Sequence, residues 1–194
     1  NRSIAFKTNY FPAYANRAKT YRALKQYPKA IEAYQETLKL RPSSVVHWEA
    51  LVDVSKQADQ YRVHVEALEA LEKLEPKKVE HSNRLGALFI KKKSLIQATS
   101  AYERSLQKNP TDLTALVAMA NLSYDSKQYG KSKAYYERVV RQNPEHQQGL
   151  ERLGEINYLQ KDYSASSAYF ARAMKENPDS PNLPYRYAQA QEKN

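Results

Sequence analysis

The stretch FPAYANRAKTYRALKQYPKAIEAYQETLKLRPSS, residues 11–44, reads as two short amphipathic helices that end at a proline, Pro42. The rest of the chain repeats this plan, with evenly spaced prolines at positions 42, 76, 110, 144 and 178. A fixed period without slippage is typical of a protein built from stacked structural repeats. The sequence therefore predicts a core that runs as a continuous ribbon between neighbouring repeats.

Apolar residues within each period predict a pair of helices. In the first period a helix is expected over residues 12–24, with a break around Tyr27. A second helix then carries Ile31, Tyr34 and Leu38 at helical spacing. Pro42 is expected to end this helix, because proline disfavours helix at the residue before it and cannot donate an N–H.

Residues that occupy the same position in successive repeats are here called a column. Several columns of this sequence resemble those of the tetratricopeptide repeat. These are a large apolar column (Trp48, Leu85, Leu116, Leu150), a small column (Ala18, Gly86, Ala120, Gly154), the tyrosine of the inter-helix turn and the closing proline. The resemblance covers five full repeats: 11–44, 45–78, 79–112, 113–146 and 147–180. It implies an all-α fold, an α-solenoid of helix-turn-helix units wound as a right-handed superhelix. The repeat 45–78 departs most, since Val52 and His64 stand where small residues are usual.

Small residues have a physical role that does not depend on the family. Two antiparallel helices approach closely only where the side chains at the crossing are small. We expect such crossings at Ala18 with Ala30, Gly86 with Ala98 and Gly154 with Ser166.

Both ends of the chain are expected to carry partial repeats. Residues 1–10 read as the tail of a preceding helix or an N-terminal cap, because Ile4 and Phe6 fall one period before Leu38 and Leu40. Residues 181–194 begin a sixth repeat or form a C-terminal helix. Partial repeats favour an excised piece of a longer protein, since a solenoid usually ends in a polar capping helix.

Composition excludes several classes of site. The 194 residues include 0 Cys, which excludes disulfides and thiolate metal sites but does not distinguish cytosol from periplasm. No run of about 18 apolar residues occurs, so no transmembrane segment is expected. The net charge of +10 is uneven, with 7 basic and 2 acidic residues in 11–44 but 5 basic and 7 acidic in 45–78. A surface on which basic and acidic repeats adjoin favours a protein partner over a nucleic-acid partner.

No catalytic or metal motif is recognisable. The histidines at 47, 64 and 81 are spaced by half a period, so they alternate between first and second helices and build no helical ligand pair. No HExxH, Gly-rich phosphate loop or nucleophile elbow occurs. The sequence predicts no enzyme activity, no cofactor and no metal. The run Lys91–Lys93 falls at an inter-helix turn. We interpret these lysines as a solvated turn in preference to a site for an anionic partner.

The resemblance implies that first helices line a concave groove in which a peptide or partner helix lies. Among the side chains left outside the core columns are Arg152, Glu155 and Tyr158, followed by Tyr185, Arg186 and Gln189. Arginine and tyrosine often anchor interfaces, and asparagine can bond a peptide backbone at both ends. We therefore predict a partner-binding track made of Asn83, Arg84, Asn121, Tyr124, Arg152 and Tyr158.

Three functions are compatible with this pattern. The first is a non-enzymatic scaffold that binds a partner protein or peptide in the groove. The second is a targeting or regulatory repeat domain of a larger enzyme or of a secretion or assembly protein. The third is a module that self-associates through the ends of its solenoid. A domain that grips the acidic tail of a heat-shock chaperone fits poorly, because only Arg84 matches the expected Lys–Asn, Asn and Lys–Arg set.

Overall fold

The computed structural model describes residues 11–194, which form eleven α-helices and no strand. The all-α fold predicted from the sequence is confirmed for these residues. The expected helix tail or cap at residues 1–10 lies outside the described part of the chain.

The helices recur at a constant interval, which is the period of the prolines in the sequence. The first helices of the periods are α2 (Phe11–Ala23), α4 (Val45–Gln57), α6 (Val79–Lys91), α8 (Leu113–Asp125) and α10 (Gln147–Leu159). The second helices are α3 (Tyr27–Leu40), α5 (Tyr61–Leu74), α7 (Leu95–Lys108), α9 (Tyr129–Gln142) and α11 (Tyr163–Glu176). A last helix, α12 (Leu183–Lys193), follows Pro181.

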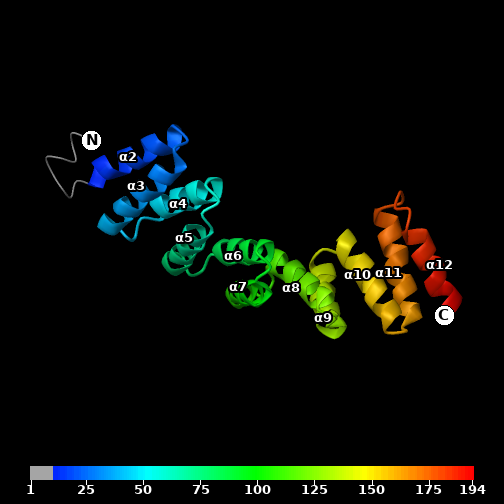
Figure 1. Ribbon diagram of the computed structural model, residues 1–194. Helices are drawn as coiled ribbons and strands as arrows, with labels where there is room; N and C mark the ends of the chain where they lie inside the picture. The colour runs from blue at the N-terminus through cyan, green and yellow to red at the C-terminus, as the bar shows by residue number, and fades with distance from the viewer. Residues whose placement is uncertain (1–10) are drawn as a thin grey trace. The chain divides into compact units, whose positions relative to one another are not determined.

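The described residues divide into two compact units, and the division falls inside α7. Unit 1 extends to Ala101 and unit 2 comprises Tyr102–Asn194. Within unit 1 each helix from α2 to α6 packs against the next, and within unit 2 the same holds from α8 to α12 (Figure 1).

Small residues at the helix crossings bring paired helices close together. Ala18, Ala30 and Ala98 are fully buried. In unit 2 the Ser166 hydroxyl donates to the Gly154 carbonyl at 2.8 Å, and the Ser132 hydroxyl donates to the Ala120 carbonyl at 2.9 Å. These side chain–backbone bonds across the pair are geometrically possible only when the two helices are in close contact.

Each inter-helix turn is closed by the same backbone motif. Lys25, Asp59, Lys93, Lys127 and Lys161 have positive φ angles between 50° and 64°. Around Lys161 its N–H donates to the Tyr158 carbonyl at 3.0 Å, and the following Asp162 N–H donates to the Asn157 carbonyl at 2.9 Å. This Schellman arrangement satisfies carbonyls that the end of a helix leaves without intrahelical partners.

Arginines tie second helices to the preceding proline junction. In unit 2 the Arg138 guanidinium donates to the Pro110 carbonyl at 2.6 Å, and that of Arg172 donates to the Pro144 carbonyl at 3.0 Å. The two bonds are one period apart. In unit 1 the Trp48 indole N–H donates to the Pro42 carbonyl at 2.7 Å, which places its ring at the junction and leaves it half-buried.

Candidate functional site

The structure places the six predicted partner-binding residues on three helices. Asn83 and Arg84 lie on α6 in unit 1, and both are half-buried. Asn121 and Tyr124 lie on α8, and Arg152 and Tyr158 on α10, all four in unit 2. The two groups are therefore described separately.

Unit 2 contains a cleft of about 510 Å³, here called the C-terminal cleft. Two of the predicted residues, Tyr124 and Tyr158, line it. Leu159 and Tyr185 add apolar surface, with 53% and 66% of their areas exposed. The remaining lining residues are Glu155, Phe170, Asn182, Arg186 and Gln189.

Glu155 is the electrostatic centre beside this cleft. Its carboxylate accepts from the Arg152 guanidinium at 2.7 Å and from the Tyr124 hydroxyl at 3.0 Å, and it also pairs with Arg186. The side chain of Glu155 is only 16% exposed, so these contacts are partly shielded from water. The Arg152 guanidinium also lies 4.3 Å from the centre of the Tyr124 ring. Arg152 thus holds both Glu155 and Tyr124 in place.

Two tyrosine pairs shape the walls of the cleft. Tyr158 meets Tyr163 edge to face, with ring centroids 5.4 Å apart, and Tyr124 meets Tyr129 in the same way at 5.5 Å. Edge-to-face contacts between aromatic rings are favourable beyond the area that they bury. Tyr124 and Tyr158 are therefore each fixed by a tyrosine at the start of the following helix.

Asn121 takes part in bonds within the protein. The Tyr136 hydroxyl donates to the Asn121 side-chain oxygen at 2.5 Å, and the Gln148 amide donates to the same oxygen at 3.2 Å. Burial raises the pKa of Tyr136 to about 12, with Arg152 opposing the shift, so its hydroxyl stays protonated as a donor at neutral pH. Asn121 is close to Arg152 through Tyr136 but does not line the C-terminal cleft.

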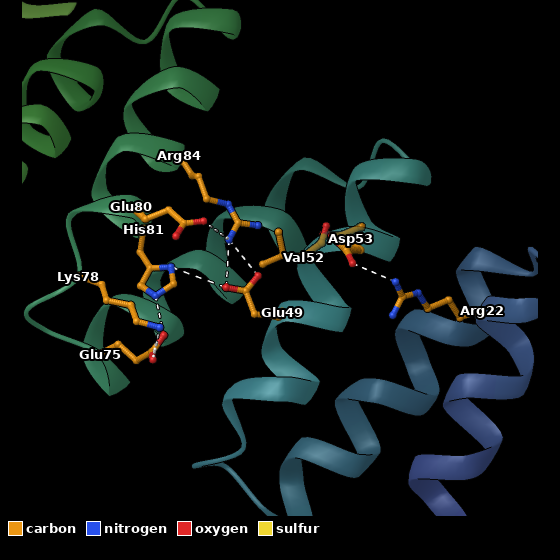
Figure 2. A network of polar contacts seen from close by, with 10 residues as sticks. Arg22, Glu49, Val52, Asp53, Glu75, Lys78, Glu80, His81 and Arg84 are labelled. Carbon is orange, nitrogen blue, oxygen red and sulfur yellow. Dashed lines mark hydrogen bonds and ion pairs between the residues drawn. The ribbon is translucent and has the colours of Figure 1, made fainter. Parts of the chain in front are cut away.

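Arg84 in unit 1 is held by an acidic partner on the preceding first helix. Its guanidinium lies 2.9 and 3.1 Å from the two carboxylate oxygens of Glu49 on α4, and 3.9 Å from Glu80 (Figure 2). Nearby, the buried His81 imidazole lies 2.8 Å from Glu75, which is also 2.6 Å from Lys78. The prediction treated Arg84 as a ligand-facing cation, whereas the structure gives it a carboxylate partner of its own.

Sequence reasoning gave no role to three important residues of the C-terminal cleft. Glu155, Tyr185 and Arg186 lie outside the core columns of the sequence but are not among the six residues of the predicted track. A signal for Glu155 was available, because it follows Arg152 by less than one helical turn and lies on the same face. A glutamate within one turn of an arginine on the same helix indicates that these two side chains pair.

A metal site and a membrane span would each require a recognisable arrangement within residues 11–194. Across this range no group of three or more His, Asp or Glu side chains is placed to hold a metal ion. None of the helices drawn from residue 11 onward combines the length and apolar character that crossing a bilayer requires.

Two family models match the sequence. Both are described as tetratricopeptide repeat, one over residues 11–44 and the other over residues 117–181, together about half of the chain. No curated protein sequence matches.

Several solved structures share the fold. YrrB, described as a TPR protein with an unusual peptide-binding site, is 15% identical with a TM-score of 0.66, and the match covers 98% of this chain and 96% of that one. MamA is 18% identical with a TM-score of 0.67 over 90% of this chain and 94% of that one. A tetratricopeptide repeat protein from Parabacteroides merdae is 12% identical with a TM-score of 0.68, and the match covers 94% of this chain and 73% of that one. These matches confirm the all-α solenoid class predicted from the sequence.

Proposed function

We propose that this chain, which belongs to the tetratricopeptide repeat family, is a non-enzymatic scaffold whose C-terminal cleft receives a segment of a partner protein. Proteins of this family are generally interaction scaffolds and not enzymes, which supports binding as the kind of function. The naming of a peptide-binding site in YrrB supports a peptide-like occupant by analogy of fold.

The observation that carries the proposal is the lining of the C-terminal cleft. Binding clefts are typically apolar and aromatic, with a few polar groups that set orientation. Tyr124, Tyr158 and Tyr185 supply aromatic surface here, and Leu159 supplies aliphatic surface. Asn182 and Gln189 supply amides that can both donate and accept bonds to a peptide backbone.

The charges around the cleft favour an uncharged anchor on the partner. Glu155 pairs with both Arg152 and Arg186, so each guanidinium already contacts a carboxylate, and the three groups together keep one net positive charge. Breaking these pairs to bind an acidic side chain would strand a partly buried charge, which is costly. We therefore expect the partner to insert an apolar or aromatic side chain between the tyrosines.

The predicted track takes on divided roles under this proposal. Tyr124 and Tyr158 contact the partner directly, while Arg152 and Asn121 position the wall of the cleft through Glu155 and Tyr136. Asn83 and Arg84 on α6 remain candidates for contacts made by unit 1.

The test is a selection of binding peptides followed by substitution of the most exposed cleft residues. Peptides that bind the full chain are selected from a library of random twelve-residue sequences. We expect the selected peptides to share an apolar or aromatic residue. The double variant Leu159→Ser/Tyr185→Ser should weaken binding of a selected peptide at least about fivefold, because it removes apolar contact with the peptide worth about 1–3 kcal/mol. Fluorescence polarisation measures the dissociation constant.

The matched control is Leu24→Ser, the same change at a leucine that is 60% exposed but lies after the end of α2 in unit 1. It should leave peptide affinity unchanged. Selected peptides that bind the double variant as tightly as the unsubstituted chain would place the binding site elsewhere.

A further inference from the structure

A second cleft, of about 340 Å³, lies in unit 1 and shares no lining residue with the C-terminal cleft. It is here called the His64 cleft, because the half-buried imidazole of His64 on α5 lines it together with Val52 on α4. Its other lining residues are Asp53, Ser55, Lys56, Asp59, Tyr61, Arg84, Ala87, Leu88, Lys91 and Lys92.

The cleft opens at the one repeat whose crossing residues are large. Positions 52 and 64 correspond to Gly154 and Ser166 in the last full repeat, which are small enough for a direct serine-to-carbonyl bond across the helix pair. In repeat 45–78 the same positions hold valine and histidine. Because larger side chains prevent the closest approach of two helices, His64 is displaced from a core position into the lining of a cleft.

The charges that line the His64 cleft are only partly compensated. Arg84 is paired with Glu49, and Asp53 is paired with Arg22 on α2 at 3.0 Å (Figure 2). Within residues 11–194 the exposed amino groups of Lys56 and Lys91 form no ion pair, and the Lys92 amino group lies 5.4 Å from the centre of the Tyr61 ring. The lining therefore contains three lysines, at positions 56, 91 and 92, but only one acidic residue that is not already paired with a basic side chain. That residue is Asp59.

The pKa of His64 is lowered by burial and by this positive field. Burial lowers the pKa of His64 below its usual value of 6.5, Arg84 and Lys56 lower it further, and Lys91 adds to the effect while Asp53 opposes it. The imidazole is therefore neutral at pH 7 and carries one N–H donor. An anion entering the cleft would meet two lysine ammonium groups and this donor together.

We propose that the His64 cleft binds an oxyanion, the carboxylate of an acidic side chain on a partner protein, between Lys56, Lys91 and His64. A nucleic-acid chain fits less well, because Asp53 and Asp59 at the same cleft repel a run of phosphates and the lining aromatic ring, Tyr61, already stacks against Lys92. This proposal is independent of the C-terminal cleft, and either can fail without the other.

The test titrates the imidazole signals of the full chain by NMR, with His64→Gln assigning the His64 signal. The probe is a blocked Gly-Glu-Gly-Glu-Gly peptide, and its Gln analogue is the neutral control. Since a bound carboxylate stabilises the imidazolium, the peptide should raise the His64 pKa in a saturable way. By reciprocity the Glu peptide should bind more tightly at pH 6 than at pH 8. The Gln analogue should neither raise the His64 pKa nor bind in a pH-dependent way.

Substitutions locate the site. Lys91→Met should weaken the Glu peptide about threefold, the range expected for loss of one exposed charge pair. Lys73→Met, which removes an exposed lysine of α5 outside the cleft, should not. A His64 pKa that the Glu peptide leaves unchanged would overturn the proposal. Inorganic phosphate or oligo(dT) that binds more tightly than the Glu peptide would overturn the assignment to a protein carboxylate.

Discussion

Gly154 on α10 is the residue at which the close packing of a helix pair can be tested most directly. A Cβ placed on Gly154 would lie 2.6–2.9 Å from ring atoms of Phe170, and Phe170 is only 2% exposed, so its ring cannot move aside freely. Gly154→Ala should therefore destabilise the protein by about 1–2 kcal/mol, because overpacking outweighs the gain in helix propensity. The midpoint of urea unfolding measures this.

Gly130 on α9 is the matched control for this change. No atom lies within 4 Å of a Cβ built there, so Gly130→Ala should stabilise by up to about 1 kcal/mol. Equal effects of the two substitutions would show that Gly154 is not at a tight crossing.

At the level of residues, the sequence predicted columns well and contacts poorly. The small column located Gly154 and Ser166 because repetition reveals which positions must be small. It could not reveal that Arg84 and Arg186 each meet a glutamate, because both pairs join different helices about one period apart. Leu74 has the spacing of a core residue but is 36% exposed, since it lies at the very end of α5.

At the level of the helical hairpin, the inter-helix turns carry a local backbone cost. Lys161 adopts φ = 64°, a left-handed conformation that costs a residue with a Cβ roughly 1 kcal/mol and glycine almost nothing. Lys161→Gly should therefore stabilise the protein by about 0.5–1 kcal/mol in thermal or urea unfolding.

Lys131→Gly is the comparison for Lys161→Gly, because Lys131 is an exposed lysine inside α9 in the same unit. There the change should destabilise by about 1 kcal/mol. If Lys161→Gly were also destabilising, the left-handed turn would not limit the stability of the hairpin.

The helices themselves were largely predictable, whereas the turn conformation was not. The expected first helix over residues 12–24 is α2, Phe11–Ala23, and the break near Tyr27 is where α3 begins. Proline and apolar spacing carry this information because they act through local geometry. Glycine is the usual sign of a left-handed turn, and none of the five turns has one at this position, so the sequence held no signal for it.

At the level of the whole molecule, the net charge of +10 should produce only weak, non-specific attraction to polyanions. Retention on a heparin column should be lost near 0.15 M NaCl, where screening shortens the reach of exposed charges to about 8 Å. A sulfopropyl column, which offers negative charge without a sugar chain, should release the protein at a similar salt concentration. Heparin binding that outlasts this salt by a wide margin would favour a nucleic-acid partner.

The fold class was visible in the sequence because one period repeats five times without slippage. The division into two compact units inside α7 was not visible, since the repeat phase is as regular there as elsewhere. The sequence predicts the partner track as one surface, yet its residues belong to both units. Their roles therefore rest on the contacts within each unit.

The arginine bonds to proline carbonyls in unit 2 also bear on how such a chain changes its length. Arg138 reaches Pro110 and Arg172 reaches Pro144, so the repeat 113–146 carries both the donor for the junction before it and the acceptor for the junction after it. A tandem duplication of this repeat would bring its own guanidinium and its own carbonyl, and the new junction would be bonded like the old ones. A gene encoding such repeats can grow by copying errors without inventing a new interface.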